Sequence, residues 1–392
     1  MILEHQHDLA AFRHAIRAWN PTVLRAGWKR DLAGASDAER DRFQRWWMAE
    51  LNKVGLGIAH WPKEYGGAGV GLEHQIVIAD EMARAGTPPI GMFVVSLIHL
   101  PGTLIPHGSE AQKRRYLAGV AQGDVWCQGF SEPNSGSDLA SLRTRAVRDG
   151  DHYVINGQKI WSSYSMYARY CILLARTSTE GAKHAGITYF VMDMQAPGVE
   201  VRPIRQSSGR ADFGALFLTD VRIPVADRVG AEGEGWRVAQ STLASERGVI
   251  AFESAERQRY AIEAFYDRAV ASDAAWLRDD QLRREFMSLL AEVQAGRRML
   301  RRLLTQTRRS PTDASRSVFP SIVKIATTSL RQRLTAFLVR LDGVDGQAPG
   351  GAPGGEDVMF DFITSFGGTI AGGTNEIQRN IISERGLGMP RM

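Results

Sequence analysis

The hydrophobic pattern of this chain changes twice along its length, which limits the folds that it can adopt. Over residues 1–122, apolar residues such as Leu9 and Phe12 recur at helical spacing. Residues 123–235 hold short runs rich in Val, Ile, Tyr, Phe and Thr, which are typical of strands. The helical period returns over residues 236–392. The pattern therefore predicts an N-terminal all-α domain, a central β-domain and a C-terminal α-helical domain with these boundaries.

Turn signals divide the central part into candidate strands. Asp149-Gly150 and Asn156-Gly157 are strong hairpin signals because both residues tolerate a positive φ, and Ala196-Pro197-Gly198 breaks the chain again. The predicted strands are His152 to Ile155, Tyr170 to Arg176, Ile187 to Met194, Val199 to Arg205 and Ala215 to Pro224.

The C-terminal part contains three long segments with helical spacing, at residues 236–270, 280–308 and 321–341. The Gly- and Pro-rich run Gly343 to Gly355 predicts a loop before a last helical region.

Length and composition indicate an ordinary globular protein. With 392 residues and 44% hydrophobic content, the chain can bury a large core in two or three domains. The N-terminus has no basic and apolar leader, and the longest apolar stretch, around Pro88 to Ile98, is too short to cross a bilayer. We therefore expect a cytoplasmic protein with no membrane partner.

The cysteines and histidines do not suggest a metal site or a disulfide framework. The two cysteines, Cys127 and Cys171, have no CxxC spacing and are expected to pack as small hydrophobic residues. His5 and His7 lie near the terminus without a third ligand. We expect no bound metal.

Two polar motifs lie in the central part. Phe130 to Asp138 reads FSEPNSGSD, whose small and hydroxyl residues let a backbone approach a ligand and offer hydrogen-bond donors. Asn156 to Ser163 reads NGQKIWSS, where Trp161 beside hydroxyl groups suits a flat, hydrogen-bonding ring system. The alternative interpretation is a set of turn serines and a core tryptophan.

Five motifs in order resemble those of the acyl-CoA dehydrogenase family. They are WPKEYGG at 61–67, FSEPNSGSD at 130–138, NGQKIWSS at 156–163, GEGW at 233–236 and GGTNEIQRNIISERGLGMPR at 372–391. The resemblance implies an α+β multidomain fold with an N-terminal helical domain, a central β-barrel or sandwich and a C-terminal helical bundle.

The resemblance also implies an FAD cofactor and the residues that bind it. Within the first of the two polar motifs are Phe130, Ser131 on the pyrimidine side of the flavin, and Ser137 toward the phosphates or CoA. Trp161 is expected to lie against the ring system and Ser163 to contact its N5 atom. The remaining candidates are Thr374 and Glu376 in the C-terminal signature.

The position of the catalytic base departs from the common family pattern. Gly372 stands where many members carry their catalytic glutamate. Other members place the base on an earlier helix, eleven residues after a glycine, and here Glu246 follows Gly235 at that distance. By resemblance, Glu246 abstracts the α-proton while flavin N5 accepts the β-hydride, and the backbone N–H of Gly372 helps to polarise the thioester carbonyl.

The implied partners are an acyl-CoA thioester, an electron-transfer flavoprotein or similar acceptor, and further subunits in a homotetramer or heterotetramer. The signature is similar to that of bacterial members acting on bulky, branched or sterol side-chain acyl groups. The Arg-x-x-Phe-Gly segment with which many members reach a neighbouring subunit's FAD is missing between Val270 and Gln294. Arg278 or Arg283 could substitute for it.

Charge leaves further functions open. The net charge of +5 suits phosphate-bearing ligands such as FAD and coenzyme A, but it would equally attract nucleic acid, or it reflects solvated helix faces. Two rival hypotheses stand beside the dehydrogenase: a non-catalytic or half-catalytic subunit of a heteromer, and a repurposed relative. The second class includes a flavin monooxygenase, an acyl-carrier-protein dehydrogenase and a nucleic-acid-binding protein, although we expect no nucleic-acid partner.

Overall fold

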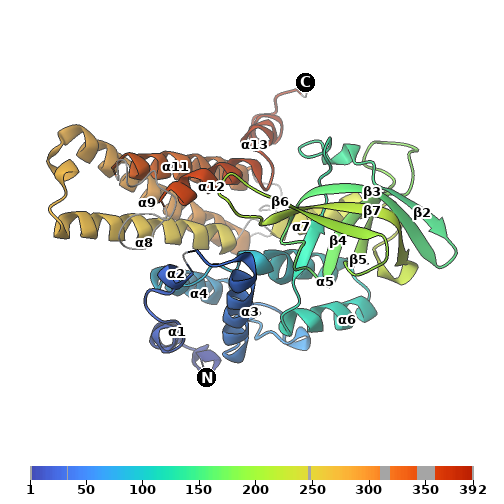
Figure 1. Ribbon diagram of the computed structural model, residues 1–392, viewed down its shortest axis with the longest axis horizontal. Helices are drawn as coiled ribbons and strands as arrows, with labels where there is room; N and C mark the ends of the chain where they lie inside the picture. The colour runs from blue at the N-terminus through green and yellow to red at the C-terminus, as the bar shows by residue number, and fades with distance from the viewer. Residues whose placement is uncertain (1, 33, 246–248, 310–317, 342–357, 391–392) are drawn as a thin grey trace. The chain divides into compact units, whose positions relative to one another are not determined.

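The computed structural model describes residues 2–32, 34–245, 249–309, 318–341 and 358–390 (Figure 1). The chain divides into two compact units. The sheet unit consists of Asp37–Gly69 and Pro88–Glu246. The bundle unit consists of Met1–Ser36, Val70–Thr87 and Arg247–Met392. The helices that precede residue 122 are thus shared between the two units.

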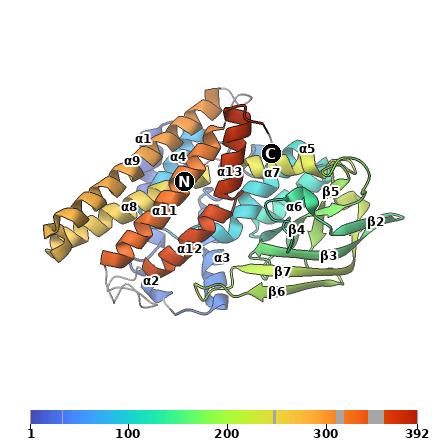
Figure 2. The ribbon, with the colours of Figure 1, turned by 90° about the horizontal axis from the view of Figure 1, so that it is seen from above.

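The sheet unit is built on a mixed sheet with the strand order β6-β7-β3-β2-β4-β5-β8, and β1 also pairs with β4. The pairs β1–β4 and β2–β4 are parallel, and the other pairs are antiparallel. Figure 2 shows β3, β7 and β6 side by side. The strands are β1 (Trp126–Gly129), β2 (Arg145–Asp149), β3 (His152–Ser163), β4 (Tyr170–Arg176), β5 (Ile187–Asp193), β6 (Val199–Ile204), β7 (Phe213–Pro224) and β8 (Arg228–Val229).

The predicted strands are confirmed, with changes at their ends. Tyr170–Arg176 is β4 as predicted, whereas β3 continues to Ser163. The sequence pattern does not predict β1, β2 or β8. Strand β2 has only one buried residue, Ala146, among charged and exposed neighbours, so it carries no apolar run.

One of the two predicted hairpin turns is wrong. Asp149-Gly150 marks the hairpin between β2 and β3, as predicted, because Asp149 ends β2 and Gly150 begins the connection. Asn156-Gly157 instead lies inside β3, at a shift of register against β7. A Cβ atom on Gly157 would lie 2.6 Å from Thr144 Oγ1, and its φ is +156°. Glycine is needed there for a bulge and a close approach, not for a chain reversal.

Helices complete the sheet unit, and the sheet has its own core. The helices are α3 (Asp37–Lys53), α5 (Leu100–His107), α6 (Glu110–Ala121) and α7 (Gly235–Ser245). A π-helix, Val95–His99, precedes α5. Both Cys127 and Cys171 are fully buried within the sheet core, which confirms their predicted packing role.

The bundle unit is helical, and α8, α9 and α11 run alongside one another in it (Figure 2). Its helices are α1 (Leu9–Val23), α2 (Trp28–Asp31), α4 (Leu72–Arg84), α8 (Val249–Ala271), α9 (Asp280–Arg309), α11 (Phe319–Leu341), α12 (Val358–Ile370) and α13 (Asn375–Ile381). The three long predicted helical segments are confirmed, except that the first contains both α7 and α8. The predicted loop Gly343 to Gly355 lies outside the described residues.

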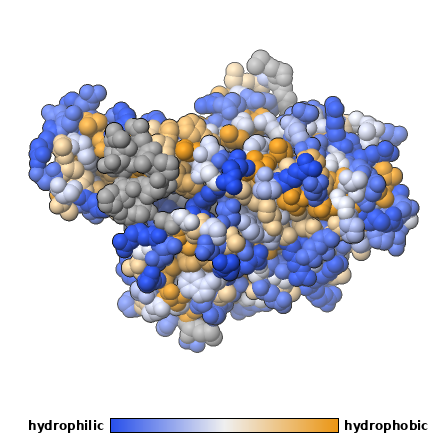
Figure 3. All heavy atoms as spheres, viewed as in Figure 1, coloured by the Kyte–Doolittle hydropathy of each residue, from blue (hydrophilic) through white to orange (hydrophobic). Residues whose placement is uncertain are grey.

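Burial of one helix face explains the bundle. Phe286, Leu289 and Val293 recur at helical spacing on α9 and are buried against Ile262 of α8 and Leu330 of α11. Figure 3 shows mainly hydrophilic residues at the left-hand end of the bundle unit, where α8 is followed by α9. The helices are therefore held by tertiary packing of their apolar faces rather than by helix propensity alone.

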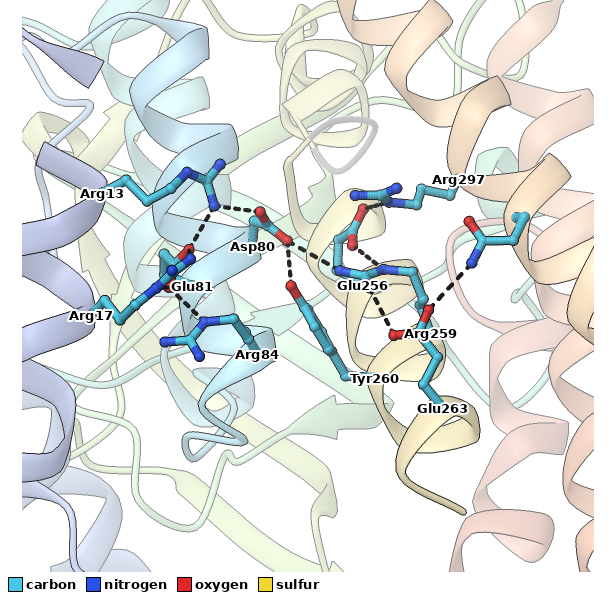
Figure 4. A network of polar contacts seen from close by, with 11 residues as sticks. Arg13, Arg17, Asp80, Glu81, Arg84, Glu256, Arg259, Tyr260, Glu263 and Arg297 are labelled. Carbon is cyan, nitrogen blue, oxygen red and sulfur yellow. Dashed lines mark hydrogen bonds and ion pairs between the residues drawn. The ribbon is translucent and has the colours of Figure 1, made fainter. Parts of the chain in front are cut away.

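A charged network links helices within the bundle unit (Figure 4). Glu81 of α4, fully buried, accepts hydrogen bonds from the Arg13, Arg17 and Arg84 side chains. Asp80 and Glu256 are also buried and meet Arg259 of α8. The paired network avoids the cost of isolated buried charges.

Within the described residues, no helix is both long enough and apolar enough to cross a membrane.

Candidate functional site

The first polar motif follows β1 and begins with two residues in different surroundings. Phe130 is buried, with its ring edge-on to Tyr189 at a centroid distance of 5.8 Å. Ser131 is half-buried, and its carbonyl oxygen accepts a hydrogen bond of 2.9 Å from the N–H of Ile160 in β3. This bond brings the first polar motif and the second one together.

A buried ion pair joins the same two motifs. Lys159 Nζ donates to Glu132 Oε1 at 2.8 Å and to the Phe130 carbonyl at 3.1 Å. The Glu132 carboxylate also accepts from the backbone N–H groups of Arg143 and Thr144, at 2.7 and 2.8 Å. The Lys159 side chain is 0% exposed and that of Glu132 is 9% exposed. The pair is therefore satisfied by hydrogen bonds as well as by charge.

Burial and pairing act against each other in this pair. Burial lowers the pKa of Lys159 to about 8, although the Glu132 charge and hydrogen bond oppose that shift. Burial alone would raise the pKa of Glu132, but the charge of Lys159 and the hydrogen bonds from Lys159 and the backbone outweigh it and hold that pKa below its usual value.

Trp161 lies at a second irregularity of β3. The register against β7 shifts between Lys159 and Ser162, and Trp161 has a φ of +60°. Positive φ is uncommon for residues other than glycine and often marks a functional constraint. The indole is 56% exposed and edge-on to Phe213. The alternative interpretation, in which Trp161 is a core tryptophan, is therefore wrong.

Unused hydrogen-bonding groups surround Trp161. Among the described residues, no acceptor is found for the N–H of Ser131, and the buried Oγ of Ser162 has no hydrogen-bond partner. Ser163, half-buried, ends β3 opposite Phe213. We define the Trp161 surface as Ser131, Trp161, Ser163 and Phe213. An exposed aromatic ring beside free polar groups can hold a flat ligand with hydrogen-bonding edges.

Ser137 lies farther along the first polar motif and is exposed. The next residue, Asp138, forms an ion pair of 2.5 Å with Lys183 and accepts a hydrogen bond from Ser141. The role of Ser137 in binding FAD stays a prediction.

The C-terminal signature forms a turn in the bundle unit. Gly372 and Gly373 have φ values of +64° and +82°, and Gln378 Nε2 donates to the Gly372 carbonyl at 2.9 Å. Thr374 caps α13 by accepting from the N–H of Ile377. Glu376 is exposed and pairs with Arg379 at 3.1 Å. The left-handed backbone at Gly372 favours glycine over a residue with a side chain.

A polar cluster lies behind this turn. Lys324 Nζ of α11 donates to the Thr369 carbonyl at 3.2 Å and to Asn375 Oδ1 at 2.8 Å. Burial lowers the pKa of Lys324 to about 8, with an opposing effect from the charge of Glu376. The cluster ties the end of α12 to the start of α13.

The predicted base, Glu246, lies outside the described residues, but the helix before it is well fixed. A Cβ atom on Gly235, the first residue of α7, would lie 2.5 Å from the carbonyl carbon of Thr188 in β5. One on Gly102 of α5 would lie 2.7 Å from the Cβ of Ser245. Glycines thus let α7 lie close to both β5 and α5.

The two proposed substitutes for the missing Arg-x-x-Phe-Gly segment have local partners. Arg278 pairs with Asp273, and Arg283 pairs with Asp280 at 2.5 Å. All of these side chains are more than half exposed. Neither arginine is held rigidly by buried contacts.

Sequence reasoning missed Lys159 and Glu132, although both lie in the quoted motifs. The alternation of inward- and outward-facing residues along β3 could have indicated them, because Lys159 falls on the buried face of the strand. A lysine at a buried strand position needs a partner. In the part of the chain that the structure describes, no group of three or more His, Cys, Asp or Glu side chains is arranged to hold a metal ion.

Family models match the chain in three consecutive parts. Residues 11–124 match the N-terminal domain of acyl-CoA dehydrogenases, residues 127–221 the middle domain and residues 233–387 the C-terminal domain. Together they cover most of the chain in the order seen in that family.

Individual relatives and solved structures match over nearly the full length. "Acyl-CoA dehydrogenase IpdE1" of Mycobacterium tuberculosis (strain ATCC 25618 / H37Rv) is 36% identical, over 98% of each chain. The structure "Tcur3481-Tcur3483 steroid ACAD" has a TM-score of 0.86 and 30% identity, covering 98% of each chain. The ChsE4-ChsE5 complex from Mycobacterium tuberculosis has a TM-score of 0.81 and 30% identity, covering 99% of this chain and 98% of that one.

Proposed function

Because this chain belongs to the acyl-CoA dehydrogenase family, we propose that it oxidises an acyl-CoA thioester between its α- and β-carbons with FAD as cofactor. The observation that carries the proposal is the agreement of all three family domains, in order, over nearly the whole chain. The matches also support our proposal that the domains extend over residues 1–122, 123–235 and 236–392.

The Trp161 surface fits a flavin. An exposed indole supplies a flat apolar face, and the N–H of Ser131 is a donor without an acceptor in the described residues. We propose that Ser131, Trp161 and Ser163 hold the ring system. The buried Phe130 is proposed to anchor the backbone next to Ser131. Ser137, Thr374 and Glu376 are proposed to contact the rest of FAD.

Two groups of this chain are proposed to act on the substrate itself. Glu246 is proposed to remove the α-proton, because a carboxylate in a closed apolar site has a raised pKa and hence a basicity suited to the task. The backbone N–H of Gly372 is proposed to donate to the thioester carbonyl as negative charge develops there. When bound, FAD supplies the acceptor for the β-hydride.

The substrate proposal is a bulky acyl group. One solved relative is named a steroid ACAD, which supports a steroid-derived thioester or a related polycyclic or branched one. The names of two solved relatives, Tcur3481-Tcur3483 and ChsE4-ChsE5, each join two proteins. We therefore propose a tetrameric assembly, either homomeric or with a second, related subunit, and electron transfer onward to an electron-transfer flavoprotein or similar acceptor.

The deciding experiment is an anaerobic absorbance titration of the purified protein with short, branched, long-chain and steroid acyl-CoA thioesters. We expect the oxidised flavin band to bleach with steroid or other bulky thioesters. A flavin that stays oxidised with every thioester would contradict dehydrogenase activity. A protein that purifies without flavin would favour the second candidate function, a subunit whose FAD site needs a different partner chain.

The base assignment has its own test. Glu246→Gln removes proton acceptance while keeping the size of the side chain, so we expect flavin reduction by substrate to slow by about 10²–10⁴-fold with flavin content unchanged. Stopped-flow absorbance measures the rate. Near-normal reduction by this variant would exclude Glu246 as the base.

A further inference from the structure

The buried pair of Lys159 and Glu132 occupies an unusual place for an ion pair. Both side chains lie in the interior of the sheet unit, and they join the two polar motifs, which hold three of the four residues of the Trp161 surface. A buried ion pair is a weak source of stability, because desolvation offsets most of the attraction. The burial of the Lys159–Glu132 pair therefore points to a role other than stability.

The contacts of the pair show what it fixes. Lys159 Nζ holds the Phe130 carbonyl, and Glu132 holds the N–H groups of Arg143 and Thr144. These bonds fix the start of the first polar motif, from Phe130 to Glu132, against Lys159 of β3 and against the segment that leads into β2. The pair thereby determines the position of Ser131 relative to Trp161, two residues beyond Lys159.

The ammonium group also acts on one particular peptide bond. The Phe130 carbonyl that accepts from Lys159 Nζ belongs to the same peptide unit as the N–H of Ser131. Hydrogen bonds in a chain polarise one another, and more strongly at low dielectric. A cation on the carbonyl therefore makes this N–H, which has no acceptor in the described residues, a stronger donor.

We propose that Lys159, paired with Glu132, is a positioning residue for the flavin: it fixes and polarises the Phe130–Ser131 peptide so that the Ser131 N–H binds the electron-rich edge of the ring system. This inference rests on the proposed function, because it requires that the Trp161 surface holds a flavin. It adds a positive charge to the surroundings of the cofactor without any direct contact between lysine and flavin.

The test is Lys159→Met in the full-length holoprotein, which keeps the apolar stem and removes the charge. We expect flavin to be lost at least tenfold more readily on dilution, measured by flavin fluorescence. We also expect the flavin midpoint potential to become more negative, because a nearby positive charge favours the reduced form. Visible absorbance spectra of the bound flavin should shift as well.

The matched control is Tyr116→Phe, which removes another buried hydrogen bond of the sheet unit. Tyr116 OH donates to Asp227 at 2.5 Å, and neither residue belongs to the two polar motifs. We expect this variant to lose stability but to keep its flavin affinity and potential. If Lys159→Met and Tyr116→Phe have the same flavin affinity and potential, the pair is purely structural and the proposal is wrong.

A second variant covers the case that Lys159→Met leaves Glu132 buried without a partner and does not fold. Lys159→Met with Glu132→Gln removes both charges, and neutral replacement of a buried pair is often tolerated. We expect the same loss of flavin affinity from it; wild-type affinity in this variant overturns the proposal. A wild-type protein that binds no flavin would instead overturn the proposed function, and the inference with it.

Discussion

At the scale of single residues, Gly235 sets how closely α7 lies to the sheet. Gly235→Ala places a Cβ atom within 2.7 Å of backbone atoms of Thr188 and Tyr189, which cannot move as a flexible side chain can. We expect a loss of about 1–3 kcal/mol of unfolding free energy. We also expect slower flavin reduction, because α7 leads directly to Glu246. Urea denaturation and stopped-flow absorbance measure the two effects.

Gly367→Ala is the matched control, because a Cβ atom there meets no atom of the described residues within 4 Å. Gly367 lies in the interior of α12, where alanine costs less conformational entropy than glycine. We expect a gain of about 0.5–1 kcal/mol in the same denaturation experiment. Equal urea midpoints for Gly235→Ala and the wild type would show that α7 has room to move away from β5.

At the scale of elements, the network around Glu81 makes the bundle unit sensitive to acid. Burial alone would raise the pKa of Glu81, but the hydrogen bonds and charges of Arg17, Arg84 and Arg13 lower it to about 2. The folded pKa lies below the unfolded value of 4.5, so this stabilisation is complete above pH 4.5 and disappears as the pH falls toward 2.

Glu81→Gln should remove this pH-dependent part of the stability. Near neutral pH the variant should lose about 1.5–3 kcal/mol of unfolding free energy, because the partly exposed Arg13, Arg17 and Arg84 side chains lose their charged acceptor. The difference in melting temperature from the wild type should narrow as the pH is lowered from 7 to 2.5. Asp149→Asn, which breaks an exposed pair with Arg222, serves as control and should cost under about 1 kcal/mol. A constant difference at all pH values would contradict a depressed pKa of Glu81.

Elements also show how far the sequence could predict this structure. The apolar runs of β4 to β7 and the long helices have clear periods, so they could be found. Strand β2 could not, because its one buried residue, Ala146, gives no period. Asn156-Gly157 has the composition of a hairpin turn but serves a bulge, since the steric demand at Gly157 comes from Thr144, the residue before β2. Ser131 and Trp161 could be chosen as candidate site residues from their motifs, and their roles stay predictions, whereas the Lys159–Glu132 contact depends on tertiary pairing.

At the scale of the whole molecule, an exposed apolar face supports assembly. Phe366 and Ile370 lie one turn apart on α12 and are 49% and 64% exposed. Apolar groups gathered on a surface commonly mark a protein interface. We expect Phe366→Ser with Ile370→Ser to lower the mass measured by light scattering.

Val147→Ser in β2 is the control for this pair, because Val147 is a similarly exposed apolar residue, at 42%. It should leave the mass unchanged. An unchanged mass in the α12 variant would place the subunit interface elsewhere, and a wild-type protein of monomer mass would contradict the proposed tetramer.

The two cysteines give this protein a built-in reporter of local unfolding. Both are 0% exposed, they pair in register on β1 and β4, and the sequence contains no others. A thiol reagent can therefore modify the native chain only after these strands separate. Its reaction rate measures opening of the sheet unit alone, while the bundle unit contributes no signal. Conversely, a cysteine introduced on an exposed helix would be the single fast-reacting position, available for a fluorescent label.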